Sequence, residues 1–213
     1  NGVEMQLYKS VYRAGEFRET INKSIFIAHV SPVRDDREAR EFIAGIKEEY
    51  KDATHNVPAF VTGNKQEHQW ASDDGEPQGT SGPPVLNLLT ENELTNLAVV
   101  VTRYFGGIKL GTGGLVRAYS SAARGAIENA GICSVNSVVA VKCRMEYSYL
   151  NKLRSMEKDG DFYICNEEYT DKITVELKAD SEKREELLSM IGNLTSGKGE
   201  ILDIAEGTHR ILL

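Results

Sequence analysis

The sequence lacks the features that mark a membrane-spanning, secreted or zinc-binding protein. Its apolar runs are all short, so we expect no membrane-spanning helix and no membrane partner. The first residues do not show a basic region followed by an apolar region and a small-residue cleavage site, so we expect no secretion signal. Only three cysteines occur, and Cys133, Cys143 and Cys165 show no C-x-x-C spacing. This favours reduced thiols in a cytoplasmic protein over disulfides or a zinc site.

Basic residues are also in short supply. The chain of 213 residues has 25 Lys and Arg against 32 Asp and Glu, a formal net charge of -7. This balance argues against general nucleic-acid binding through net charge, and we expect no DNA specificity, but it leaves room for a local basic patch. The length predicts one large or two small domains.

The most informative stretch runs from Leu97 to Gly131. It begins with a Val-rich apolar run at 97–101, typical of a strand buried on both faces. Glycines follow, and then apolar residues at helical spacing up to Gly131, which we place at the helix C-terminus. Glycines before a helix allow main-chain N–H groups to approach an anion. The glycines of this predicted cradle are Gly106, Gly107, Gly111, Gly113 and Gly114.

Charge in this stretch has one sign. No Asp or Glu occurs between Glu93 and Glu128, and the charged residues of the gap are Arg103, Lys109, Arg117 and Arg124. We therefore predict a phosphate-binding or RNA-binding patch, with Tyr104 and Phe105 as stacking faces. The alternative is close packing of helix and sheet with solvated cations. The motif is neither a Walker loop nor a dinucleotide fingerprint.

A second loop, at 71–84, is dense in carboxylates, Gly and Pro. Asp73, Asp74 and Glu76 could hold a hard cation such as Mg²⁺, although their spacing does not fit an EF-hand. The alternative is a rigid acidic surface turn. His55 lies in a predicted strand at 53–62; a histidine there is most often packed and hydrogen-bonded, but it remains a candidate site residue.

The periodicity predicts an α+β protein of two domains, residues 1–136 and 137–213. Strands are expected within 8–30, a helix over 35–51 and a short helix over 85–89. The second domain has the order β-α-β-β-α-β, which is ferredoxin-like. Its predicted helices follow Ser148 and Asp180 as N-caps, and its final strand spans 200–213.

Four segments resemble one family. SDDGEPQGTSGPP at 72–84, TRYFGGIKLGTGGLVRAYSSA at 102–122, KSIFIAHV at 23–30 and DATHNVPAFV at 52–61 look like the signature of the IMPACT family in its bacterial YigZ-type form. The likeness covers about 130 residues and is specific, because these motifs are long.

The resemblance implies a fold like domain 2 of ribosomal protein S5 for the first domain. For the second it implies a ferredoxin-like fold, similar to domains III and V of elongation factor G. The eukaryotic relative modulates translation under amino-acid stress, by competing for the activator of a translation-restraining kinase. Kinship of fold is an analogy for function, not a proof of it.

Two functions remain open at this point. The first is a non-enzymatic, translation-linked regulator without catalytic residues, whose basic patch binds RNA, a ribosome or a nucleotide, with a translation-factor protein as another partner class. The second is a Mg-nucleotide-dependent enzyme that uses the 72–82 acidic loop and the 106–114 glycine loop. For the first we expect no cofactor.

Overall fold

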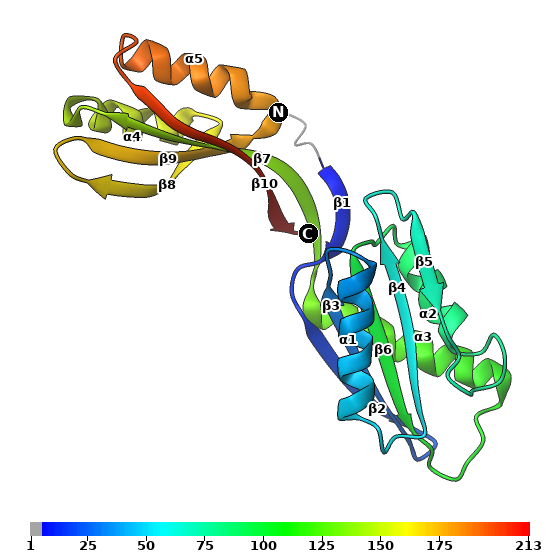
Figure 1. Ribbon diagram of the computed structural model, residues 1–213. Coiled ribbons are helices and arrows are strands. Elements are labelled where there is room, and N and C mark those ends of the chain that lie inside the picture. The colour runs from blue at the N-terminus through cyan, green and yellow to red at the C-terminus, as the bar shows by residue number, and fades with distance from the viewer. Residues whose placement is uncertain (1–5) are drawn as a thin grey trace. The chain divides into compact units, whose positions relative to one another are not determined.

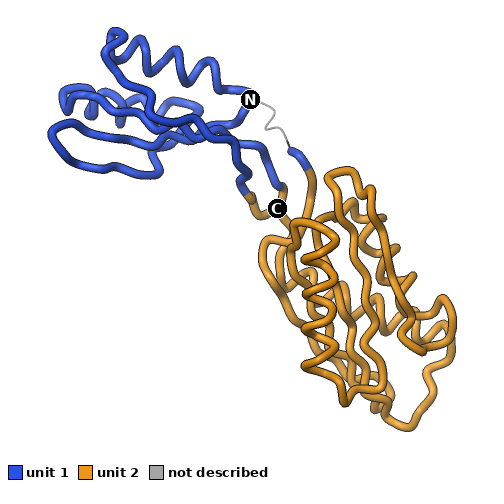
Figure 2. Tube along the Cα trace, in the orientation of Figure 1, with its two compact units in different colours: residues 1–7, 135–209 blue, residues 8–134, 210–213 orange. Residues whose placement is uncertain are grey.

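Residues 6–213 are described in this computed structural model, and they divide into two units (Figures 1 and 2). Unit 2 comprises residues 8–134 and 210–213, and unit 1 comprises residues 1–7 and 135–209. The chain passes between the units within β1 (Gln6–Val11), β7 (Ile132–Met145) and β10 (Glu200–Leu212). The expected division after residue 136 differs from this one, because residues 210–213 belong to unit 2.

A five-stranded sheet organises unit 2. Its order is β2-β3-β6-β4-β5, and all neighbours are antiparallel. The strands are β2 (Gly15–Ile21), β3 (Ser24–Pro32), β4 (His55–Thr62), β5 (His68–Ala71) and β6 (Leu97–Tyr104). The Val-rich run forms the central strand β6. It is buried on both faces, as predicted, because helices cover both faces of the sheet there.

Alternation along the strands divides unit 2 into two cores. Helix α1 (Asp36–Glu49) packs on the face that includes Phe60, Ala98 and Val100. Helices α2 (Gly82–Glu91) and α3 (Gly111–Ala130) pack on the other face, over Phe26, Val99 and Val101. Figure 1 shows α1 in front of the sheet and α3 behind it. Asp35 begins α1 by accepting the N–H of Glu38.

Unit 1 has the predicted β-α-β-β-α-β order. Helices α4 (Leu150–Asp159) and α5 (Arg184–Leu194) connect β7, β8 (Phe162–Tyr169), β9 (Ile173–Asp180) and β10. The sheet order β1-β7-β9-β8, with β10 also paired to β7, places the four strands of the motif as a ferredoxin-like fold does. The predicted α+β fold of two domains is therefore confirmed.

One strand was missed and two local predictions were wrong. Strand β5 was not predicted, because its four residues lie at the edge of the sheet without an alternating apolar pattern. Ser148 does not cap α4, since it lies inside a 3₁₀ turn, Tyr147–Tyr149, that leads into the helix. Asp180 precedes a similar turn, Ser181–Lys183, and makes no side-chain cap for α5.

No helix within residues 6–213 combines the length and the apolar character needed to cross a membrane.

Candidate functional site

The glycine loop begins where β6 leaves the sheet. A Cβ atom on Gly106 would lie 2.1 Å from the main chain of Lys23, in the β2–β3 turn, so only glycine fits there. Gly107 and Gly111 have φ values of +86° and +72°, which favour glycine. The glycines therefore let the chain turn closely past the neighbouring hairpin before α3 begins.

Helix α3 starts without a side-chain cap. Among residues 6–213, no side chain caps its first N–H groups, and its first turn contains no acidic residue. Gly113 and Gly114 belong to this turn, and Gly113 is exposed. Uncapped N–H groups and the positive end of the helix dipole face whatever approaches this turn, so the geometry suits an anion.

Three of the four predicted cations lie before or along α3: Lys109 precedes the first turn, Arg117 lies in the next turn, and Arg124 lies about 10 Å beyond Arg117. Lys109, Arg117 and Arg124 are exposed, and none of them makes an ion pair or a side-chain hydrogen bond within residues 6–213. Arg117 folds back over the helix start, because a Cβ on Gly113 would lie 3.5 Å from its Nη1 atom. We call Lys109, Arg117 and Arg124 the exposed cation set.

A groove between α2 and α3 adjoins the exposed cation set. Its volume is about 380 Å³, and Pro83, Pro84 and Asn87 line it from α2. Val116, Ser120 and Arg124 line it from α3. Glu91 of α2 also lines the groove, so the hollow beside Arg124 carries charges of both signs.

The fourth cation, Arg103, is not part of this surface, and its burial argues against the predicted role as a phosphate ligand. Its side chain is 5% exposed, and its Nη1 donates to Glu76 Oε1 at 2.7 Å. The guanidinium also lies 5.5 Å and 5.4 Å from the ring centres of Phe26 and Phe105. A buried, paired guanidinium cannot meet an external phosphate without first losing its partner.

Glu76 holds a second buried group. The Tyr119 hydroxyl, on α3, donates to the same Oε1 atom at 2.6 Å. Burial, and then the hydrogen bond to the Glu76 carboxylate, raise the pKa of Tyr119, so the hydroxyl keeps its proton and remains a donor. We call Glu76, Arg103 and Tyr119 the buried charge cluster; it ties the acidic loop to β6 and α3.

Asp73 is likewise occupied by internal bonds. Its carboxylate accepts the N–H groups of Gly79, Ser81 and Gly82 at 2.7, 3.1 and 3.0 Å, and the Ser81 hydroxyl at 2.9 Å. Burial opposes ionisation, but these hydrogen bonds together outweigh it and lower the pKa of Asp73. Asp73 therefore fixes the loop that leads into α2.

Asp74 and His55 close the loop against β4. One Asp74 oxygen lies 3.1 Å from Lys47 Nζ, and the other accepts the N–H of Asn56 at 2.7 Å. His55 Nδ1 lies 2.8 Å from the Asp74 carbonyl, which can only accept, so Nδ1 carries the proton. Its Nε2 lies 3.7 Å from Glu76 Oε2. No group of three potential metal ligands occurs in the described part of the chain.

Tyr104 lies apart from the exposed cation set. Neighbouring residues of a strand face opposite sides of the sheet, so Tyr104 faces away from Arg103 and the α3 side. Its hydroxyl donates to Asp52 Oδ1 at 2.8 Å. Phe105, by contrast, is in the loop and is 47% exposed.

The pairing of Glu76 with Arg103 escaped sequence reasoning because 27 positions separate the two residues. One signal could have revealed it. Arg103 follows Val99 and Val101 at a spacing of two, so strand alternation places it on a buried face. A cation in such a position needs a buried partner.

Comparisons with known proteins agree with the resemblance. Residues 22–127 match the family model of the Impact N-terminal domain, and residues 143–198 match DUF1949, a domain of unknown function. IMPACT family member YvyE of Bacillus subtilis is 37% identical over 194 residues, which are 91% of this chain and 89% of YvyE. IMPACT family member YigZ of Escherichia coli is 30% identical over 190 residues, covering 88% and 93%.

The chain belongs to the IMPACT family. A crystal structure described as a hypothetical protein resembles this IMPACT family protein with a TM-score of 0.60 and 28% identity. The likeness covers 93% of this chain and 97% of the other, so it includes both units.

Proposed function

We propose that this IMPACT family protein is a non-enzymatic, translation-linked regulator that binds RNA phosphates, including those of the ribosome. The exposed cation set and the uncapped start of α3 make the contact. The observation that carries the proposal is the absence of any ion-pair partner for Lys109, Arg117 and Arg124 within residues 6–213, in a chain of net charge -7.

The exposed cation set lies in a stretch of sequence without Asp or Glu. Of the other twelve basic residues of unit 2, six form an ion pair within the described residues, as Lys47 does with Asp74. Cations kept free of carboxylates retain their full attraction for an external anion. Phosphate contacts of this kind position a protein on RNA without reading its sequence.

The link to translation comes from the family. The family resemblance implies a eukaryotic relative that modulates translation and two domain types that recur in proteins working on ribosomes. The three cysteines are free thiols, two buried and one exposed, which fits action in the cytoplasm.

The acidic loop supports a structural role over the Mg-nucleotide alternative. Asp73 binds main-chain N–H groups, Asp74 binds Lys47 and Asn56, and Glu76 binds Arg103 and Tyr119. A Mg²⁺ ion would have to displace these partners. The proposal therefore gives no part to a metal or cofactor.

Binding to a fluorescent structured RNA and to ribosomes, measured across a salt series, tests the proposal. About three phosphate contacts give a slope of log K against log salt of about -2 to -3. The variants Lys109→Ala, Arg117→Ala and Arg124→Ala are each expected to weaken binding and to lower the slope by about 1.

Arg37→Gln and Lys51→Gln are the matched controls. Both residues are exposed cations on the α1 side of the same unit, so each control changes the net charge equally. An affinity that does not depend on salt concentration, or that falls as much in the controls as in the test variants, would refute the proposal. Salt-independent binding of ribosomes but not of RNA would indicate a protein partner instead.

A further inference from the structure

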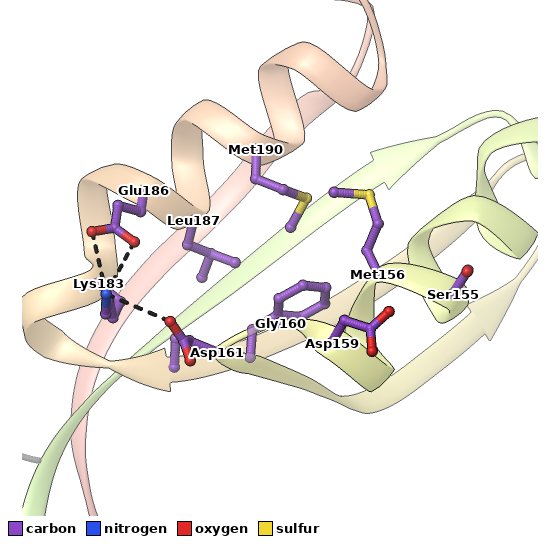
Figure 3. Close-up of a pocket in the computed structure, with 11 residues that line it drawn as sticks. Ser155, Met156, Asp159, Gly160, Asp161, Lys183, Glu186, Leu187 and Met190 are labelled. Carbon is purple, nitrogen blue, oxygen red and sulfur yellow. Dashed lines mark hydrogen bonds and ion pairs between the residues drawn. The ribbon is translucent and has the colours of Figure 1, made fainter. Parts of the chain in front are cut away.

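Unit 1 carries a second surface, which differs from the exposed cation set in its residues and in its chemical character. A groove of about 440 Å³ lies between α4 and α5, and Figure 3 shows the side chains that line it. Its apolar side chains are those of Met156, Phe162, Ala179, Leu187 and Met190. Beneath it lies the buried core of unit 1, which includes Leu153, Leu177 and Ile191.

The groove is long. A second hollow of about 440 Å³ continues it and shares Met156, Glu186 and Met190 with the first. It extends the lining to Asn193 and Leu194, near the end of α5. The combined groove therefore follows most of α5, a helix of about 16 Å at 1.5 Å per residue.

The floor of the groove is adaptable. Met156 and Met190 are each partly buried and extend toward one another from α4 and α5 (Figure 3). Methionine side chains are flexible and polarizable, and surfaces rich in them accept apolar groups of different shapes.

The combined groove is lined by three acidic residues, Asp159, Asp161 and Glu186, and by two basic ones, Lys152 and Lys183. Lys183 holds Asp161 at 3.5 Å and Glu186 at 3.2 Å, and Figure 3 shows the three side chains together. Asp159 lines the groove on the side of Ser155 and Met156 (Figure 3), and it makes no ion pair or side-chain hydrogen bond within residues 6–213. Unit 1 as a whole has 16 acidic and 10 basic residues, so its field favours a cationic occupant.

We propose that this groove binds a basic amphipathic helix of a partner protein. The apolar side chains of that helix contact Met156, Leu187 and Met190, and one of its Lys or Arg side chains pairs with Asp159. Two helices, and not a strand edge, flank the groove, so an added strand would gain no ladder there. A helix that lies in a groove needs only an apolar stripe and a matching charge. This proposal does not rest on the proposed RNA-binding function.

Full-length protein and two synthetic helical peptides test the proposal. Both peptides carry Leu at positions i, i+4, i+7 and i+11; one has Lys at its polar positions and its twin has Glu. The probe is the ¹³C-methyl NMR signals of Met156 and Met190, with affinity from fluorescence anisotropy. We expect the Lys peptide to shift both signals and to bind at least about tenfold more tightly than its twin.

Two variants separate charge from shape. Asp159→Lys changes an exposed residue and should lower the affinity for the Lys peptide by about threefold to tenfold. Met190→Lys should abolish detectable binding, with thermal unfolding as the check on folding. The matched control is Asp203→Lys on β10. Asp203 is exposed, and its neighbour Ile204 packs on the core. Strand alternation therefore places Asp203 on the face of the sheet opposite to Ile204.

Equal binding of both peptides, or an Asp159→Lys variant that binds like Asp203→Lys, would overturn the proposal. A Met156 signal that shifts with protein concentration alone, and that no longer does so in Met190→Lys, would assign the groove to a second copy of the chain and overturn the proposal as well.

Discussion

Arg103 and Arg117 come from one acid-free stretch but lie in opposite environments. Arg103 is buried and bound to Glu76, whereas Arg117 is exposed and unpaired within the described residues 6–213. The difference follows from the element that each residue occupies. Arg103 is on the inner face of a central strand, and Arg117 is on the outer face of a helix. A run of cations in a sequence therefore does not define a surface until the faces are known.

The same comparison assigns different tasks to the two sets. The buried charge cluster joins the acidic loop, β6 and α3, so its loss should be felt in stability. The exposed cation set holds nothing together, so its loss should be felt in binding. The following predictions separate the two, beginning with the largest expected effect.

Glu76→Ala should cost about 3–5 kcal/mol of the free energy of unfolding, because it leaves the Arg103 guanidinium buried without its partner. Urea denaturation measures this cost. The control is Glu41→Ala, which breaks the exposed ion pair with Arg37 and should cost less than about 1 kcal/mol. Similar costs for the two variants would contradict the assigned burial.

Tyr119→Phe should cost about 1.5–3 kcal/mol, because it removes a hydrogen bond to a carboxylate while leaving the ring packed against Phe26. In the Glu76→Ala background, the same change should cost much less, since its acceptor is already absent. A double-mutant cycle by urea denaturation gives this coupling. Strict additivity of the two changes would mean that the hydroxyl and carboxylate act independently.

Asp73→Asn should cost about 1–2 kcal/mol at neutral pH, because it weakens the bonds to the main chain before α2. The lowered pKa of Asp73 adds a pH dependence. Its stabilisation is present above the unfolded pKa of about 4 and is lost as pH falls through the lower folded pKa. The gap between wild type and variant should therefore narrow below about pH 4; a gap that widens there would contradict the ionised role.

Arg117→Ala should change the free energy of unfolding by less than about 0.5 kcal/mol, because the side chain is exposed and unpaired in the described structure. The same variant should still lose RNA affinity in the salt series. Thermal unfolding and binding measured on one preparation provide the check. A destabilised Arg117→Ala protein would show that this cation, too, supports the fold.

The fold was predictable from the sequence because it depends on local periodicity. The Val-rich strand, α3 and the β-α-β-β-α-β order each produce a repeating pattern of apolar residues. The family signature added the identity of the first domain. Strand β5 and the 3₁₀ turns before α4 and α5 leave no such pattern, and so they were missed.

The site was predictable only in part. Exposed cations on a glycine loop and a helix can be recognised locally, as for Lys109 and Arg117. The partners of Arg103 and Asp74 cannot, because Glu76 and Lys47 reach them only after the sheet has formed. The phosphate-binding role of the exposed cation set stays a prediction.

The last residues of the chain set a condition for work with fragments. Arg210 donates to the Val11 carbonyl at 2.9 Å, and the Leu213 N–H donates to Ile132 O at 2.9 Å. An expression fragment that stops at Asn136 would lose both bonds and uncover the main chain of β1 and β7. Studies of the first domain in isolation should therefore append residues 210–213, by circular permutation or as a separate peptide.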